Sequence, residues 1–412
     1  MLRSHLTLAV KVLGRRPFFT FVSLVGVTLT LLVLTVAAAL VDHLFGPLAP
    51  ETRQERTLVL ASLELTGGRS SSTGWPGYAF LDRYARGLPG VERLAVTTQA
   101  RSVFSYVGGE RVRSYLRHTD AEFWRVLEFR FLEGGPFLDE DVAAARPLAV
   151  INASTRERFF GGAPALGRTL EIDGQRFRVA GVVPDVPFLR LVPFADVWVP
   201  LSTLPGEGWR RDLRGGFLGI LLARDRADFP AIRSELAARL PTVDLAGTPF
   251  TTAYAVPETL FETMARLLLR TGRGQRSLAD RLTLVLAGLA LAFMALPALN
   301  LVNLSLSRAL ERATEIGVRR AFGATRSGIL VQFVLENLLL TLLGGLLALG
   351  LAQVALRALT ASGLLPYADL HVNWRVFAWG LGFAVAFGVL SGAYPAWRLA
   401  RLHPVEALRG GR

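Results

Sequence analysis

Long apolar runs and one long segment of mixed composition alternate along this chain. Four runs are long enough to cross a bilayer, which takes about 20 mostly apolar residues, and they cover 18–41, 282–306, 328–356 and 375–395. Between the first two lies the segment 42–281, which is long enough to form a hydrophobic core of its own. The pattern predicts an α-helical membrane protein with four transmembrane helices and a large domain inserted between the first and second.

Within 42–281, short strand patterns and single helical patterns follow one another. Apolar stretches bounded by turn residues predict strands at 57–65, 93–98, 103–107, 110–117, 148–151, 169–172, 176–183, 197–201 and 217–223. Helical spacing of apolar residues predicts helices at 78–86, 122–127, 230–240 and 257–270. This mixture predicts an α+β domain.

Three local signals add detail to this prediction. Asp173-Gly174 is typical of a tight hairpin turn between two strands. The stretch 67–77 is rich in glycine and serine and is typical of a loop. Asp228 stands just before the proline that opens the helix at 230–240, so we expect it to cap that helix.

The formal charge of +13 is unevenly distributed. Residues 42–281 hold 31 basic and 28 acidic residues, whereas the remainder holds 15 basic and 5 acidic ones. Thirteen of those 15 fall in 1–16, 307–327 and 396–412. The positive-inside rule therefore places these three segments in the cytoplasm, and it places 42–281 and 357–374 outside. The charge is a topology signal, and we expect no nucleic-acid partner.

The first apolar run also resembles a secretory signal, because it follows basic residues and contains Ala37-Ala38-Ala39. Its length exceeds the apolar core of about 7–15 residues that a signal peptide has, which favours a retained anchor. The preceding segment 1–17 has Leu6, Val10 and Leu13 at helical spacing. It predicts either an amphipathic helix on the inner leaflet or a plain solvated flank.

Motifs for chemistry are missing from the sequence. There is no cysteine, and the single lysine, Lys11, follows no glycine-rich loop, so neither a thiolate site nor a P-loop is expected. The five histidines form no i, i+4 pair, and no Gly-x-Ser-x-Gly elbow occurs. Asp139-Glu140-Asp141 is interpreted as a solvated turn. We expect no catalytic residue, cofactor or metal in this chain, and therefore no enzyme.

Five segments carry a recognisable family pattern. Residues 311–324 match Glu-Arg-x-x-Glu-Ile-Gly-x-x-Arg-Ala-x-Gly-Ala, and 394–409 match a C-terminal Pro-Ala…Pro-Val-Glu-Ala-Leu-Arg signature. Residues 123–138, 147–167 and 176–184 match the outer-domain pattern of the same family, from Phe…Leu…Gly…Phe to Phe-x-Val-x-Gly-Val-Val. Over nearly its whole length, and in the family order, the chain resembles the MacB/FtsX-type ABC transporter permeases.

The resemblance assigns a role to 307–327, because family members use this helix to couple to the ATPase subunit. The residues agree with a short docking helix: Glu315 and Arg319 can pair at i, i+4, and Gly323 is a helix stop. On the residues alone, a plain charged loop between two spans stays open. The predicted coupling residues are Glu311, Arg312, Glu315, Ile316, Gly317, Arg319, Arg320, Phe322 and Gly323.

The predicted spans contain a few residues that are unusual in a bilayer. Glu336 is an intramembrane carboxylate; we favour a structural role, paired with an arginine near the interface, over a functional one. Pro297 predicts a kink in the second span. Small residues allow close helix packing, within the chain or at a dimer interface, and the candidates are Gly344, Gly345 and Gly350.

The resemblance implies a permease subunit in a bacterial inner membrane. It implies a separate ABC ATPase that binds ATP and magnesium, and a second permease chain, identical or homologous. The leading function is export of a hydrophobic compound or peptide by mechanotransmission, with a periplasmic adaptor and an outer-membrane channel as further partners. The alternatives are lipoprotein release, as in LolC/LolE-type relatives, and FtsX-like regulation of a cell-wall hydrolase, against which the large outer domain argues.

Overall fold

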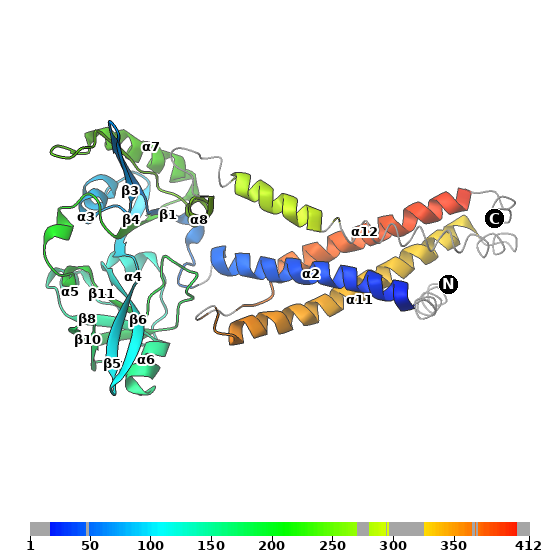
Figure 1. Cartoon of the computed structure of the whole chain (residues 1–412), viewed down its shortest axis with the longest axis horizontal. Coiled ribbons are helices and arrows are strands. Elements are labelled where there is room, and N and C mark those ends of the chain that lie inside the picture. Colours follow the sequence, from blue (N-terminus) through cyan, green and yellow to red (C-terminus); the bar gives the residue numbers. More distant parts are fainter. Residues whose placement is uncertain are drawn as a thin grey trace. The chain divides into compact units, whose positions relative to one another are not determined.

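The computed structural model describes residues 17–46, 49–269, 280–293, 295, 325–364, 367 and 370–401. The chain divides into two compact units, and each is described by itself (Figure 1). The helical unit comprises Met1–His43, Asp280–Leu364 and Asp369–Arg412. The sheet unit comprises Leu44–Ala279 and the short segment Leu365–Ala368.

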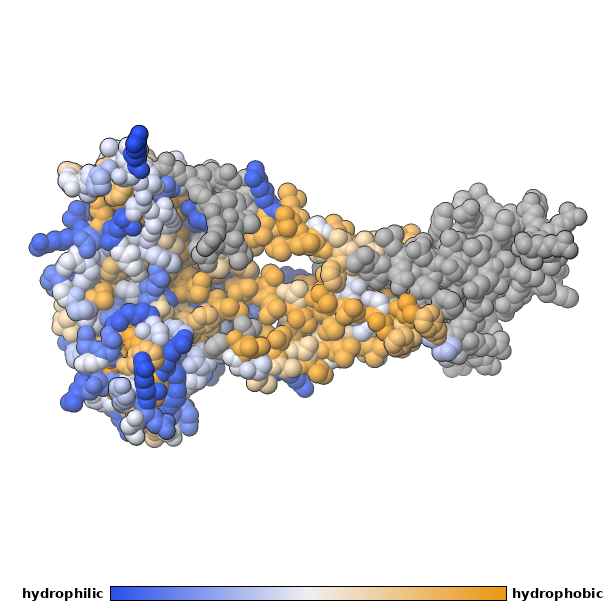
Figure 2. Space-filling model, in the orientation of Figure 1, coloured by the Kyte–Doolittle hydropathy of each residue, from blue (hydrophilic) through white to orange (hydrophobic). Residues whose placement is uncertain are grey.

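The helical unit contains α2 (Pro17–Phe45), α11 (Arg326–Ala361), α12 (Trp374–Arg401) and a helix over 280–293. α11 packs along α12, and their apolar side chains join those of α2 in one cluster. Hydrophobic residues cover the visible surface of these helices (Figure 2).

Two helices among the described residues are long and apolar enough to cross a membrane, Thr20–Phe45 and Leu330–Ala361, and Trp374–Leu390 is a shorter apolar helix. These helices coincide with the first, third and fourth predicted spans. The predicted span 282–306 is helical over its described part, and most of its second half lies outside the described residues. The total of four spans therefore stays a prediction.

A mixed ten-stranded sheet forms the centre of the sheet unit. Its main path runs β1-β12-β4-β6-β11-β8-β10-β7, with β5 paired to β6 and β9 paired to β10. β6 runs parallel to β11 and β8 runs parallel to β10. The strands are β1 (Thr57–Leu60), β4 (Val91–Thr98), β5 (Arg101–Val107), β6 (Glu110–Thr119), β7 (Glu133–Gly134), β8 (Leu148–Asn152), β9 (Thr169–Ile172), β10 (Gln175–Val183), β11 (Val197–Pro200) and β12 (Phe217–Ala223).

A smaller sheet and several short helices complete the unit. The small sheet has the order β13-β2-β3 and is built from β2 (Leu63–Gly67), β3 (Ser70–Gly74) and β13 (Thr252–Tyr254). The helices are α3 (Tyr78–Phe80), α4 (Glu122–Val126), α5 (Asp139–Ala143), α6 (Ala153–Phe160), α7 (Phe229–Arg239) and α8 (Leu260–Leu269), with single turns η1 (Gln54–Arg56), η2 (Leu81–Ala85), η3 (Leu201–Thr203), η4 (Gly208–Arg210), η5 (Arg226–Asp228) and η6 (Leu240–Thr242).

Alternating side chains of the large sheet supply separate hydrophobic clusters on its two faces, because successive residues of a strand point to opposite faces. Leu58 of β1 packs in the same cluster as Ile232 of α7, on one face. Its neighbour Val59 belongs to the other cluster, with Phe123 of α4 and Trp198 of β11. The prediction of an α+β domain is confirmed.

The structure corrects the predicted elements at several places. The predicted strand 57–65 is two strands that belong to different sheets, because Ala61 and Ser62 interrupt it. The predicted loop 67–77 contains β3, whose serines pair with β2. The hairpin at Asp173-Gly174 is confirmed: both residues have positive φ, 54° and 73°, between β9 and β10.

The structure also corrects the roles predicted for two groups of acidic residues. Asp139-Glu140-Asp141 opens the short helix α5 instead of forming a solvated turn. Asp141 is buried and accepts a hydrogen bond from the Leu138 amide at 2.8 Å, so this acid fixes the start of a helix. Asp228 makes no side-chain cap of α7. The side chain of Asp225 instead caps the preceding turn η5 through the Ala227 amide, at 2.8 Å.

Candidate functional site

Three chain segments connect the sheet unit to the helices along the sequence. One follows α2 and leads into β1, the second is α8, which precedes the helix over 280–293, and the third holds Tyr367, between α11 and α12. Each makes specific contacts inside the sheet unit. We call these the linker contacts and treat them as the candidate functional site, because these segments are the covalent connections between the two units.

Tyr367 is held by a polar cluster of the sheet unit. Its hydroxyl donates to Asp196 Oδ1 at 2.9 Å and accepts from Arg158 Nη2 at 3.0 Å. Arg158 also forms an ion pair with Asp196, at 3.3 Å. Asn152 Nδ2 and the backbone amide of Tyr115 donate to the same carboxylate, at 3.0 and 2.9 Å. The cluster thus joins Tyr367 to β6, β8 and α6.

Asp196, which accepts the hydrogen bond from the Tyr367 hydroxyl, is buried in the sheet unit. Asp196 lies just before β11 and is buried, so its charge depends on the donors around it. Burial, and then the neighbouring Asp196 carboxylate, raises the pKa of Tyr367 to about 12. The phenol therefore stays protonated at neutral pH and donates to the carboxylate. Tyr367 itself has a positive φ of 59°, which a non-glycine residue rarely adopts.

The segment after α2 is held by a buried ion pair. Arg190 Nη1 contacts Glu51 Oε2 at 2.8 Å, and Arg190 Nη2 donates to the Gly46 carbonyl at 2.7 Å. Both side chains of the pair are almost fully buried. Burial raises the pKa of Glu51, and the Arg190 guanidinium opposes this rise. Removing one partner would leave an unpaired buried charge, so the pair fixes the segment 46–51 to the loop that carries Arg190.

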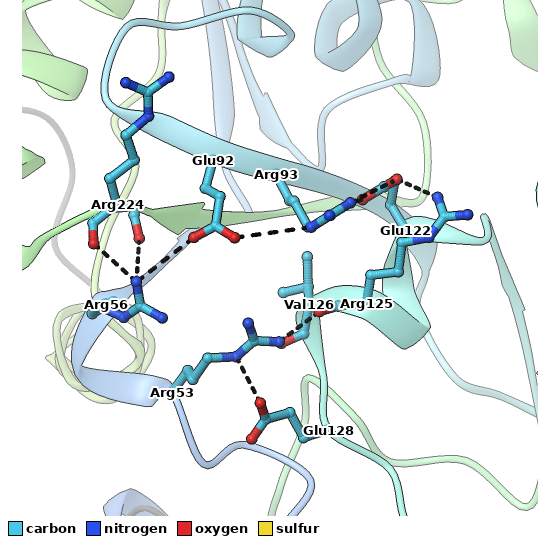
Figure 3. Close-up of polar contacts among 10 residues, drawn as sticks. Arg53, Arg56, Glu92, Arg93, Glu122, Arg125, Val126, Glu128 and Arg224 are labelled. Carbon is cyan, nitrogen blue, oxygen red and sulfur yellow. Dashed lines mark hydrogen bonds and ion pairs between the residues drawn. The ribbon is translucent and has the colours of Figure 1, made fainter.

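A surface network extends this attachment (Figure 3). Arg53 donates to the carbonyls of Arg125 and Val126 at the end of α4. Arg56 donates to the Arg224 carbonyl at 2.9 Å and pairs with Glu92 at 3.6 Å. Exposed ion pairs contribute little singly, about 0–1 kcal/mol. Together, however, these contacts fix the position of η1 relative to β4, α4 and the end of β12.

α8 is tied to the sheet unit at its N-terminal end. Thr259 and Glu262 form a reciprocal cap: Glu262 Oε2 accepts from the Thr259 amide at 2.7 Å, and Thr259 Oγ1 accepts from the Glu262 amide at 3.2 Å. Arg233 of α7 pairs with Glu262 at 2.5 Å. Phe261 packs edge-on against Phe45, the last residue of α2, with ring centroids 5.3 Å apart. The first and second linkers therefore meet.

The predicted coupling residues lie outside the described residues, as does Pro297. They are Glu311, Arg312, Glu315, Ile316, Gly317, Arg319, Arg320, Phe322 and Gly323. Their role stays a prediction. Among the residues that the structure does describe, no group of three His, Asp or Glu side chains could hold a metal ion.

Glu336 lies on a buried polar face of α11. It is 2% exposed and accepts a hydrogen bond from Gln332 Nε2, one turn earlier, at 3.0 Å. Asn337 and Thr341 continue this face, and Thr341 Oγ1 donates to the Asn337 carbonyl at 2.9 Å. The carboxylate therefore faces the interior of the helical unit, where an intramembrane polar group is shielded from lipid.

Two of the three predicted packing glycines lie at close helix contacts within the chain. A Cβ at Gly344 would lie 2.8 Å from Val27 Cγ1 of α2, and one at Gly345 would lie 2.6 Å from Leu381 Cδ1 of α12. The Gly344 carbonyl also accepts from Thr28 Oγ1 at 3.2 Å. A Cβ at Gly350 would meet nothing within 4 Å among the described residues.

The sequence reasoning missed the residues that carry the linker contacts. Arg158, Asp196 and Tyr367 are far apart in sequence and match no motif. The sequence contained one signal for this cluster. Asp196 stands between apolar residues at the start of a strand, which is typical of a buried acidic residue. Arg190 and Glu51 are 139 positions apart, so no local pattern could have paired them.

Two models of known protein families match the chain, one over its N-terminal half and one over its C-terminal part. The model of the MacB-like periplasmic core domain matches residues 20–239, and the model of the FtsX-like permease C-terminal region matches residues 287–404. The chain is 26% identical over 332 residues to the uncharacterised ABC transporter permease YknZ of Bacillus subtilis, an alignment that covers 80% of this chain and 79% of that protein.

Longer relatives match over part of their length. The macrolide export ATP-binding/permease protein MacB of Bdellovibrio bacteriovorus is 29% identical over 67% of this chain and 41% of its own length. The pyoverdine export ATP-binding/permease protein PvdT of Pseudomonas aeruginosa is 26% identical over 77% of this chain and 47% of its own length. The chain thus spans less than half of these two relatives.

Solved structures of outer domains are also similar. The extracellular domain of the transporter YknZ covers 48% of this chain and 99% of its own, with a TM-score of 0.37 and 16% identity. The periplasmic region of MacB from Actinobacillus actinomycetemcomitans covers 53% of this chain and 94% of its own, with a TM-score of 0.36 and 16% identity. The first family model alone covers more than half of the 412 residues. The chain therefore belongs to the family of ABC transporter permeases that have a MacB-like periplasmic core domain, followed here by an FtsX-like permease region.

Proposed function

We propose that this chain is the permease subunit of an ABC transporter that exports a hydrophobic compound or peptide. In this proposal, ATP hydrolysis on a separate ATPase subunit changes the conformation of the sheet unit on the outer side of the bacterial inner membrane. Membership of the permease family supports the transporter class. The names of two relatives, which refer to export of macrolides and of pyoverdine, support export as the direction.

The proposed assembly has two permease chains, identical or homologous, and two ATPase subunits. Each permease chain crosses the membrane four times with both ends in the cytoplasm. The ATPase binds ATP and magnesium and contacts the segment 307–324, for which the sequence predicts a short helix that carries Glu315, Arg319 and Arg320. The permease chain itself binds no nucleotide, because its sequence offers no glycine-rich loop ending in lysine.

The observation that carries the proposal is the Tyr367 contact. Tyr367 lies between two membrane-type helices in sequence, yet its hydroxyl is bound inside the sheet unit by Asp196 and Arg158. Together with the ion pair of Arg190 and the capped α8, this gives the sheet unit a fixed contact to each chain segment that leads to it. Such a unit follows the helices when they move, which is what mechanotransmission requires.

The proposal is tested by co-purification with candidate ATPase subunits. We compare the wild-type chain with a Glu315→Arg/Arg319→Glu/Arg320→Glu variant, and an Arg224→Glu variant in the sheet unit serves as a charge-reversal control. We expect the wild type and the control to retain the ATPase and the triple variant to lose it. An ATPase that binds all three equally would place the contact elsewhere, and failure of every candidate to bind would contradict the transporter assignment.

A second measurement separates binding from coupling. Hydrogen exchange of the wild-type complex in nanodiscs is compared with ATP and with ADP. We expect nucleotide-dependent exchange in peptides that contain the linker contacts, at 46–56, 258–269 and Tyr367. Exchange that differs only in the helical unit would contradict mechanotransmission while leaving the ATPase contact intact.

A further inference from the structure

An open cavity of about 640 Å³ is lined by residues of the sheet unit, among them residues of α8, one of the three linkers. The large sheet forms one wall, with Val59 and Leu218, and α8 forms another, with Leu260 and Met264. Phe188, Leu191, Val192 and Phe194 of the loop before β11 line a third side. The volume of the cavity is that of a small-molecule site, about 300–1,000 Å³.

One wall of this apolar cavity carries a buried cation. Arg117 of β6 is 2% exposed, and its guanidinium donates to the carbonyls of Thr98, Leu191 and Phe194 at 2.8, 2.8 and 3.1 Å. All these partners are neutral. Within the part of the chain that the structure describes, no carboxylate forms an ion pair with Arg117, and the nearby Glu51 is already paired with Arg190.

The charge of Arg117 is retained at neutral pH. Burial lowers its pKa to about 9, which still leaves the side chain protonated at pH 7. Arg117 Nη1 also donates to Thr97 Oγ1, at 3.4 Å. A buried cation without a counter-ion is unfavourable, and an anion placed beside it would gain a charge partner and a charge-assisted hydrogen bond from the second N–H of Nη2. The other charged groups of the cavity, Glu258 and Arg266, form an ion pair with each other. The lining therefore has a net positive charge.

We propose that this cavity binds an amphiphile that has an apolar chain or ring system and one anionic group, with the anion beside Arg117. The proposal rests on the proposed function and narrows it, because it names a class of cargo. The apolar lining accommodates the body of the molecule, and the buried guanidinium selects the head group. Trp75 and Leu191 also line the cavity, and they are 37% and 42% exposed.

Cargo binding is coupled to the linkers through α8. Thr263, Met264 and Arg266 line the cavity from the same helix that precedes the helix over 280–293. Leu191 and Val192 line it from the loop fixed by Arg190. A displacement of α8 or of this loop changes the shape of the cavity, so the same motion that passes through the linker contacts would release the ligand.

The test uses photolabelling of the full chain in phosphatidylcholine nanodiscs without an ATPase. One probe is a diazirine analogue of palmitate, and its matched control is the same chain ending in an alcohol. Labelled peptides are quantified by mass spectrometry after digestion. We expect the acid to label peptides that contain Met264 or Val192, with the alcohol about tenfold weaker, since one charge-assisted hydrogen bond contributes a factor of that order.

Three variants make the test specific. Arg117→Met removes the cation and keeps an apolar side chain, and we expect it to abolish the preference for the acid. Ala100→Phe fills the cavity while leaving Arg117 intact, and we expect it to reduce labelling of the sheet unit by both probes. Arg111→Met, an exposed arginine on the same strand, should behave like the wild type. If Arg117→Met fails to fold, Ala100→Phe tests whether the labelling takes place in the cavity, and the comparison of acid and alcohol in the wild type tests the preference for an anion.

Several results would overturn the proposal. They are labelling confined to the helical unit, equal labelling of the sheet unit by acid and alcohol, or unchanged labelling in Ala100→Phe. Because the labelling assay contains no ATPase, a negative labelling result would contradict the ligand proposal without affecting the result of the co-purification test. Repeating the labelling in nanodiscs with phosphatidylglycerol separates the sources of the ligand: loss of labelling identifies anionic bilayer lipid, and persistence identifies a free amphiphile.

Discussion

Replacing Tyr367 with phenylalanine removes one oxygen atom from the contact that ties the segment between α11 and α12 to the sheet unit. The ring is kept, so packing changes little. The hydroxyl donates to Asp196 Oδ1 at 2.9 Å and accepts from Arg158 at 3.0 Å. Asp196 keeps Asn152 and Arg158 as partners, and the sheet unit should therefore keep its fold.

The size of the effect follows from the charge of the acceptor. A hydrogen bond to a charged group contributes about 1.5–3 kcal/mol, against about 1 kcal/mol for a neutral pair. We take about 2 kcal/mol for the hydroxyl, which shifts the equilibrium between bound and released Tyr367 by about 30-fold. Because the pKa of Tyr367 is raised to about 12, the contact should be unchanged from pH 7 to pH 9.

The assay is hydrogen exchange of the full chain in nanodiscs, read in peptides that contain Tyr367. Local opening limits exchange there, so a release equilibrium shifted about 30-fold gives a comparable rise in rate. Tyr106→Phe is the matched control, because Tyr106 is 74% exposed on β5. In the assembled transporter, the same variant should weaken the nucleotide-dependent exchange of the sheet unit without reducing ATPase binding.

Two results would refute this reasoning. Unchanged exchange in Tyr367→Phe would mean that the hydroxyl does not hold the segment. An equal rise in Tyr106→Phe would mean that the effect is general to the loss of a phenol. Global unfolding at a lower temperature in Tyr367→Phe alone would show that the residue supports the fold of the sheet unit itself.

The remaining predictions concern stability and are measured by thermal or urea unfolding of the purified chain. Arg190→Met should cost about 3–5 kcal/mol by leaving Glu51 unpaired, and Arg190→Met/Glu51→Leu should recover much of this; a double variant as unstable as the single one would contradict the ion-pair argument. Burial lowers the pKa of His118 to about 4, below its unfolded value, so about 3 kcal/mol of stability present above pH 6.5 should be lost as the pH falls to 4. His118→Phe should flatten that pH dependence, and an unchanged slope would exclude His118 as its source. Gly344→Ala should cost about 1–3 kcal/mol because its Cβ would meet Val27 at 2.8 Å. Gly350→Ala, whose Cβ would meet nothing within 4 Å among the described residues, should be neutral or stabilising, and equal costs at the two glycines would contradict the packing argument.

The elements that the sequence predicted best are those with strong local signals. The apolar runs, the amphipathic α8 and the Asp173-Gly174 hairpin each depend on residues of one continuous segment of the chain. The family pattern then placed the chain among the permeases. β3 was missed because Ser70–Gly74 has no apolar residue and only one strand former, Thr73, and its pairing with β2 makes it a strand.

The linker contacts and the cavity could not have been predicted in the same way. They join residues that are far apart in sequence, such as Tyr367 with Asp196 and Arg190 with Glu51. A single sequence contains no local pattern for such pairs. Arg117 looked like one of many arginines, and only its burial against carbonyl oxygens distinguishes it.

The first strand of the sheet unit, β1, lies beside the segment just before α8. The Val59 amide of β1 donates to the Glu258 carbonyl at 2.6 Å, and the Glu258 amide donates back to the Val59 carbonyl at 2.9 Å. The roughly 200 residues between these positions therefore leave and return at one point. A domain whose ends adjoin can be exchanged or enlarged through one junction in the chain, although an exchange would also remove the partners of Tyr367. Such an arrangement allows the domain to be replaced during evolution while the membrane helices are kept. It also gives protein engineers a defined junction, at Val59 and Glu258, for domain exchange.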